Sequence, residues 1–99
     1  MAKEIVWNRE ALNQYNTIQN YLLSESNYKI AKSFNDRFFN FLEILSAQPE
    51  IGSIEFEAKG IRGFLVHKYT KIFYKIDQDK IYLLSVFDTR QDSAQTNFE

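Results

Sequence analysis

The stretch from Lys71 to Phe87, KIFYKIDQDKIYLLSVF, decides the fold. Its two halves, Lys71 to Ile76 and Lys80 to Phe87, are rich in β-branched and aromatic residues, and the polar tripeptide Asp77-Gln78-Asp79 separates them. This pattern is typical of two antiparallel strands joined by a hairpin. Ile61 to Tyr69 has the same character. We therefore predict three consecutive antiparallel strands in the second half of the chain.

The middle strand of these three has two chemically different faces. Its residues alternate between two sets, which are Ile72, Tyr74 and Ile76 on one side and Lys71, Phe73 and Lys75 on the other. Because successive side chains point to opposite faces of a strand, the first set predicts a buried face and the second a partly exposed, basic face. We expect the second face to be available for function.

A short strand and an amphipathic helix are predicted at the start of the chain. Ile5 to Trp7 is a brief β-prone stretch, and Asn8 after it is a residue type that commonly caps the N-terminus of a helix. From Arg9 to Leu23, apolar residues recur every three or four positions, which is the period of a helix with one buried face. These apolar positions are Ala11, Leu12, Tyr15, Ile18, Tyr21 and Leu22.

The second helix is predicted to run antiparallel to the first. Polar residues from Ser24 to Asn27 favour a turn, so we expect the new helix to begin near Tyr28. Its core positions are Ala31, Phe34, Phe38, Phe41 and Leu45, widened by Ile30, Leu42 and Ile44. Pro49 ends it, and Gly52 suits the turn that follows. Two helices joined by so short a link lie side by side as a hairpin.

Together these elements predict an α+β fold in the order β-α-α-β-β-β. The chain has 99 residues, of which 44% are hydrophobic and 16% aromatic, and this composition fits one globular domain over residues 1–99. A helical hairpin packed on one face of a small antiparallel sheet would bury every apolar stripe. The regular spacing of Phe34, Phe38 and Phe41 indicates core packing rather than an aromatic ligand site.

Composition excludes several classes of function. The chain has no Cys and a single His, so its residues supply no disulfide, no thiolate metal site and no all-imidazole site, and we predict neither a metal nor a cofactor. Twelve basic against thirteen acidic residues argue against binding nucleic acid over the whole surface. The sequence has no recognisable signal peptide and no apolar run that could span a bilayer. We expect a cytoplasmic protein with no membrane partner.

Several short motifs occur in a characteristic order along nearly the whole chain. They are Ile5-Val6-Trp7 with Ala11, Ile18-x-x-Tyr21-Leu22, Ala31 with Phe34, Leu45-x-x-x-Pro49-x-x-Gly52, Gly60-Ile61-Arg62, Lys71-Ile72-Phe73-Tyr74 and Ile81 to Arg90. In this order and spacing the sequence resembles the RelE/ParE superfamily of toxins from bacterial toxin-antitoxin modules, also called plasmid stabilisation proteins.

The resemblance implies the toxin of a type II toxin-antitoxin module, which inhibits growth and is neutralised by a cognate antitoxin. The antitoxins of this superfamily wrap an extended segment around the toxin. RelE-like members cut mRNA at the ribosomal A site, whereas ParE-like members poison DNA gyrase. The fold alone does not choose between the ribosome and gyrase as targets.

The resemblance also marks three candidate site residues, Arg62, Lys71 and Arg90. If the chain is an enzyme, the resemblance implies a metal-independent mRNA endoribonuclease, whose reaction needs cations on the scissile phosphate and groups that move protons. Arg62, Lys71 and Arg90 match positions that carry basic residues in the RelE-like branch, and they could equally contact an acidic target. The alternative is that they are solvated charges or partners for antitoxin carboxylates.

The end of the chain departs from the RelE-like pattern. After Arg90 there is no Tyr or His, and Phe98 cannot transfer a proton. His67 could act as a general base, although its neighbours also suit a plain strand position. We therefore expect a ParE-like or catalytically divergent toxin, a possible poison of DNA gyrase. The alternatives are a RelE-like ribosome-dependent mRNA endonuclease and an inactive relic that only binds antitoxin.

Basic residues are concentrated in one segment. Lys59 to Lys80 holds six basic and two acidic residues, a net charge of +4, while the remainder of the chain is acidic. This segment could be a docking face for an acidic partner, or its lysines could protect strand edges from aggregation. Glu55 and Glu57 precede it in an expected loop, and we assign them no acid-base role.

Overall fold

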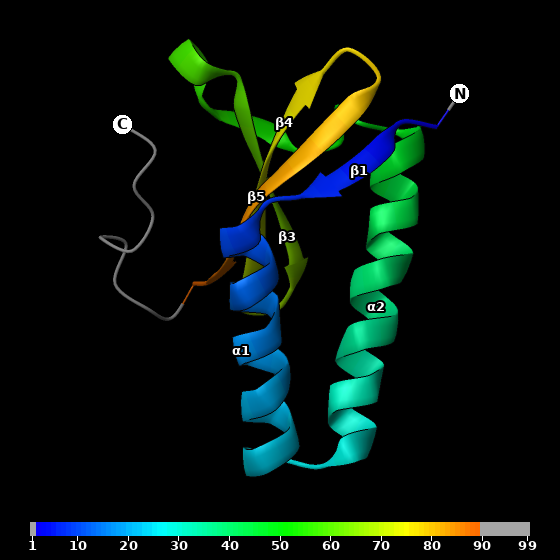
Figure 1. The fold of residues 1–99 in the computed structure, drawn as a ribbon, viewed down its shortest axis with the longest axis vertical. Coiled ribbons are helices and arrows are strands. Elements are labelled where there is room, and N and C mark those ends of the chain that lie inside the picture. Colours follow the sequence, from blue (N-terminus) through cyan, green and yellow to red (C-terminus); the bar gives the residue numbers. More distant parts are fainter. Residues whose placement is uncertain (1, 90–99) are drawn as a thin grey trace.

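Two antiparallel helices cover one face of a five-stranded sheet in the computed structural model, which describes residues 2–89 (Figure 1). The elements are β1 (Glu4–Trp7), α1 (Arg9–Glu25), α2 (Tyr28–Ala47), β2 (Ser53–Phe56), a 3-10 turn (Glu57–Lys59), β3 (Ile61–His67), β4 (Thr70–Asp77) and β5 (Lys80–Asp88). The turn between the helices projects beyond one end of the sheet (Figure 1). This arrangement confirms the predicted α+β architecture.

The sheet is mixed rather than wholly antiparallel. Its strand order is β1-β5-β4-β3-β2, and the four strands from β2 to β5 form an antiparallel meander as predicted. β1 adds a parallel pair at the other edge, with Ile5 opposite Ile81. Parallel strands need a long crossover. Here the helical hairpin and the meander together supply it.

An additional strand, β2, lies at the edge of the sheet where a loop was expected. It pairs with β3, and the register is irregular between Ile54 and Phe56. The segment alternates polar and apolar residues, but it is only four residues long and mostly exposed. Pairing with β3, rather than local propensity, makes this segment a strand.

Both helices begin at an asparagine that caps the first turn. The Asn8 side chain accepts a hydrogen bond from the backbone N–H of Ala11 at 2.8 Å, as its position before a helix predicted. Asn27 accepts one from the N–H of Ile30 at 2.9 Å. Each bond satisfies one of the backbone donors that a helix N-terminus leaves free. Because Asn27 caps α2 directly after the end of α1, the link between the helices is only two residues long.

The core lies between the helices and the central strands. The predicted core positions Ala31, Phe34, Phe38, Phe41 and Leu45 of α2 are buried together with Leu42, whereas Ile30 and Ile44, predicted to widen this stripe, are exposed. α1 contributes Ala11 and Tyr15. Leu12 and Tyr21, which were predicted in the stripe of α1, are about half exposed at 46% and 56%. α1 thus buries a narrower stripe than its periodicity predicted.

β5 contains a bulge, and β4 is buried on both faces at Phe73 and Tyr74. Phe73 is opposite Ser85 and Tyr74 is opposite Leu83, so Leu84 has no partner on β4. Tyr74 lies in the core under the helices, whereas Phe73 points to the other face and is nevertheless only 5% exposed. The rings of Phe56 and Phe87 pack around it, with centroids 5.9 and 6.3 Å away. The second face was predicted to be partly exposed, and at Phe73 it is buried.

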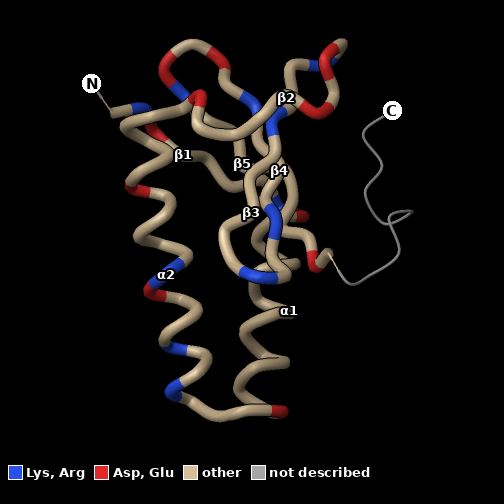
Figure 2. The backbone as a smooth tube through the Cα atoms, turned by 180° about the vertical axis from the view of Figure 1, so that it is seen from behind, with Lys and Arg blue, Asp and Glu red and all other residues tan. Residues whose placement is uncertain are grey.

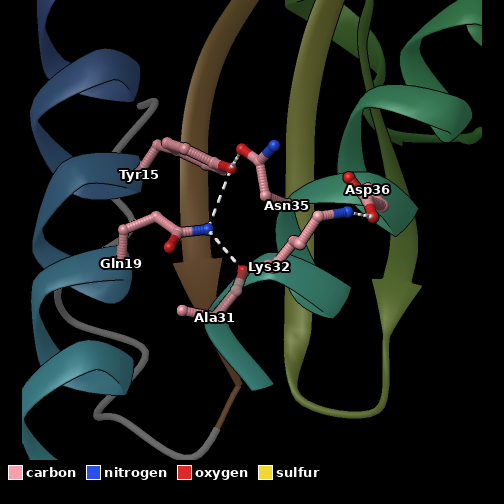
Figure 3. Close-up of polar contacts among 6 residues, drawn as sticks. All are labelled: Tyr15, Gln19, Ala31, Lys32, Asn35 and Asp36. Carbon is pink, nitrogen blue, oxygen red and sulfur yellow. Dashed lines mark hydrogen bonds and ion pairs between the residues drawn. The ribbon is translucent and has the colours of Figure 1, made fainter. Parts of the chain in front are cut away.

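A polar network joins α1 to the first turns of α2 (Figure 3). The Tyr15 hydroxyl donates to Oδ1 of Asn35, and Nε2 of Gln19 donates both to the Tyr15 oxygen at 3.0 Å and to the carbonyl of Ala31 at 3.2 Å. Burial raises the pKa of Tyr15 above its usual value, so the hydroxyl stays protonated and able to donate. These bonds satisfy polar groups where the helices are in contact.

Candidate functional site

Arg62, the first predicted site residue, is engaged with the loop that follows α2. Its guanidinium donates to the carbonyl of Gly52 at 2.7 Å and to that of Glu50 at 3.3 Å. The Tyr74 hydroxyl holds the same loop, because it donates to the carbonyl of Pro49 at 2.7 Å and accepts from the N–H of Gly52 at 2.8 Å. Arg62 thus supports the path of the chain into β2.

Lys71, the second predicted site residue, is held in an ion pair. Its Nζ lies 2.6 Å from Oε2 of Glu55 on β2, and both side chains are about one quarter exposed. The Lys71 ammonium also lies 5.4 Å from the ring centroid of Phe73. Glu55 therefore neutralises the cation that was predicted to contact phosphate or an acidic target. The sequence could not pair these residues, because they are on strands that are not neighbours.

In the described part of the chain, the predicted residues do not form one site. Arg62 is opposite Tyr74 in the register of β3 and β4, while Lys71 is opposite Leu65. Residues 62 and 65 differ by an odd number of positions, so Arg62 and Lys71 point to opposite faces of the sheet. Arg90 lies outside the described residues.

An open groove lies where α1, the first turns of α2 and the ends of the central strands meet. It has a volume of about 1210 Å³ and is lined by apolar and aromatic side chains together with polar ones. The lining includes Tyr21 from α1, Ile30 and Phe34 from α2, Tyr69 from the turn after β3, and Val86 from β5. Residues from both helices and from β3, β4 and β5 line it, so no single stretch of sequence could signal it.

His67 lines this groove and is held against the core. Its ring lies 5.9 Å from the ring of Phe34, edge to face. Burial lowers the pKa of His67 below its usual value, and the nearby charges of Arg37 and Lys68 lower it further. A neutral imidazole at physiological pH is compatible with the general-base hypothesis, which remains a prediction.

Within residues 2–89 no group of three or more His, Cys, Asp or Glu side chains could hold a metal ion. No helix in this part of the chain is long and apolar enough to cross a membrane.

Comparison with known proteins gives one family match. A family model described as the ParE toxin of the type II toxin-antitoxin system parDE matches residues 5–93. A search of curated proteins found no match. Among solved structures, this chain is similar to a chain of the "Chromosomal ParDE TA system from P. aeruginosa", with a TM-score of 0.74 and 14% sequence identity. The similarity covers 88% of this chain and 96% of that one, and at this identity it shows a shared fold.

Proposed function

Because the chain belongs to the family of ParE toxins of type II toxin-antitoxin systems, we propose that it inhibits growth by poisoning DNA gyrase and that a cognate antitoxin neutralises it. The observation that carries this proposal is the match of the family model over residues 5–93, which includes every described helix and most of every described strand. Gyrase is the target that the resemblance to the ParE-like branch implies.

The geometry of the predicted cations supports gyrase over RNA as the target. Cleavage of RNA through its 2′-hydroxyl needs cations and proton-transfer groups that converge on one phosphate. Arg62 and Lys71 point to opposite faces, and each is bonded to protein groups. An mRNA endonuclease would therefore need a site built around other residues, Arg90 among them.

A supercoiling assay tests the proposed target. We expect the purified protein to inhibit supercoiling by gyrase or to trap cleaved DNA, while mRNA on programmed ribosomes stays intact. Codon-linked cleavage of that mRNA, lost in Arg90→Ala, would instead establish the RelE-like nuclease. If the free protein is harmless at high expression and does not affect gyrase, the remaining interpretation is an inactive relic that only binds antitoxin.

A co-purification experiment tests the partner. Type II modules encode toxin and antitoxin together, so the probe is the product of the adjacent open reading frame. We expect it to form a stable complex with this chain when both are co-expressed, and to restore growth. Failure of the complex to form would remove the support for a cognate antitoxin at that locus.

A further inference from the structure

The sheet face away from the helices carries a row of aromatic rings. Phe56 on β2 and Phe87 on β5 flank Phe73 on β4, with ring centroids 5.9 and 6.3 Å from that of Phe73. Phe56 and Phe87 are only partly buried, and Leu65 on β3, which points to the same face, is 53% exposed. Both helices pack on the opposite face (Figure 1). An apolar surface that crosses four strands is typical of a binding surface.

Cations border this row where β3 begins. Lys75 is opposite Ile61, the first residue of β3, and points to the same face as Phe73. Lys59 precedes Ile61 by two residues, and Figure 2 shows basic positions on β3 and β4. Lys75 is exposed and takes part in no ion pair within residues 2–89. The face therefore suits an occupant that places a carboxylate beside an apolar side chain.

Residues 90–99 of this chain carry that combination. Their only large apolar residue is Phe98, and Glu99 follows it directly. Asp92 is a second carboxylate, and residues 91–99 contain no basic residue. The segment from Lys59 to Lys80, which supplies two strands of this face, has a net charge of +4. The charge and the single aromatic residue of segment 90–99 thus complement this face.

The segment also begins within reach of the face. The N–H of Thr89 donates to the carbonyl of Tyr69 at 2.8 Å, which fixes the start of the segment beside the turn between β3 and β4. The nine residues 90–98 can span about 30 Å when extended, whereas the distance across the sheet from β5 to β2 is three strand spacings, about 15 Å. A tethered segment has an effective concentration in the millimolar range, which favours it over a second copy or a separate protein.

We propose that residues 90–99 fold back over the sheet face away from the helices, with the ring of Phe98 packed on Phe56 and Phe73 and the carboxylate of Glu99 beside Lys59 and Lys75. The segment then acts as a strap, and any partner that uses this face has to displace it first. This inference is independent of the proposed function, and its failure would leave that proposal unchanged.

Disulfide trapping tests the position of the segment. The chain has no Cys, so two introduced cysteines form one defined disulfide. In the full chain under mild oxidation, we expect Lys75→Cys with Glu99→Cys to form an intramolecular disulfide at least fivefold faster than Lys29→Cys with Glu99→Cys. Lys29 is the matched control because it is an exposed lysine of α2, on the other side of the sheet. Equal rates would show a segment with no preferred position and would overturn the proposal, and so would a disulfide-linked dimer.

Removal of the Phe98 ring tests the anchor. Added to the Lys75–Glu99 cysteine pair, Phe98→Ala should slow disulfide formation at least fivefold, whereas Gln95→Ala, a change in the same segment, should leave the rate unchanged. In the chain without cysteines, Phe98→Ala should also shift the amide signals of Phe56 and Phe73 in nuclear magnetic resonance spectra, and Gln95→Ala should not. The proposal is wrong if Phe98→Ala leaves the trapping rate unchanged, and equally if those two signals stay in place.

Discussion

The hydroxyl of Tyr74 bonds twice to the loop after α2. It donates to Pro49, accepts from Gly52 and lies near Arg62, whose guanidinium binds the same loop. Burial raises the pKa of Tyr74 above its usual value, so the phenol keeps its proton and both bonds persist at neutral pH. The loop that leads into the edge strand is thus held from inside the core.

Removal of this hydroxyl should destabilise the fold. Tyr74→Phe leaves the N–H of Gly52 and the carbonyl of Pro49 without this partner, and we expect the free energy of unfolding to fall by about 1–3 kcal/mol in urea titration. The matched control is Tyr28→Phe at the exposed start of α2, which should change stability by less than about 0.5 kcal/mol. Equal effects would show that the bonds to Tyr74 contribute little.

His67 should make stability depend on pH. Its pKa is below 6.5 in the folded state, so between that lowered value and 6.5 the unfolded chain binds more proton than the folded one. The free energy of unfolding should therefore decrease as pH falls from 7 through the folded pKa. Thermal unfolding of His67→Gln should lack this component between pH 7 and 5. An identical pH dependence in the variant would assign the effect to other groups.

At the scale of elements, the two glycines of the β2–β3 edge differ in what surrounds them. A Cβ on Gly52 would lie 2.7 Å from the carbonyl oxygen of Gly63 and 2.9 Å from the Tyr74 ring, both held in place by the fold. A Cβ on Gly63 would meet only the ends of Glu55 and Lys71, at 2.7 and 2.9 Å. The first contact is with backbone and core, and the second is with side chains that can move.

We therefore predict that a Gly→Ala substitution destabilises the fold more at Gly52 than at Gly63. We expect Gly52→Ala to lower the free energy of unfolding by about 1–3 kcal/mol through overpacking. Gly63→Ala should separate the Lys71–Glu55 ion pair at a cost of less than about 1 kcal/mol, the value of a partly exposed pair. A larger loss in the free energy of unfolding for Gly63→Ala than for Gly52→Ala, measured by denaturant titration, would contradict this account.

The elements that local sequence determines were predicted well. Asn8 caps α1, the stripe from Ala31 to Leu45 is buried, and Asp77-Gln78-Asp79 coincides with the turn between β4 and β5. The two discrepancies in sheet topology depend on distant partners. β2 forms a strand by pairing with β3. β1 pairs in parallel with the edge of β5.

The candidate site was predicted less completely, and for the same physical reason. The predicted roles of Arg62 and Lys71 depended on a resemblance, but what each side chain contacts depends on Gly52 and Glu55, which lie far from them in the chain. The groove has no signature of its own in the sequence, because both helices and the three central strands contribute to it. A short stretch of sequence cannot reveal a surface of this kind.

At the scale of the whole molecule, Trp7 connects the sheet to both helices. It is the only Trp in the chain and stands on β1 opposite Leu83 of β5. Its ring lies 5.6 Å from that of Tyr15 on α1 and 5.7 Å from that of Phe38 on α2. One fluorophore therefore reports on the hairpin and the sheet together.

Tryptophan emission and helical circular dichroism should change together. Because the ring packs on both helices and its strand pairs with β5, we expect coincident transitions for the two signals in urea, as for a two-state domain. The far-ultraviolet signal arises mainly from the two helices. A change in tryptophan emission at distinctly lower urea would instead show that β1 detaches before the rest unfolds.

The parallel pair of β1 and β5 also joins the earliest and latest parts of the described chain to be made. During synthesis β1 leaves the ribosome first, and its partner strand emerges only after residues 80–88 have been added. Until then the core lacks Ile81, Leu83 and Val86, and the ring of Trp7 has no strand to hold it in place. A nascent chain therefore cannot complete this fold until residues 80–88 have emerged from the ribosome.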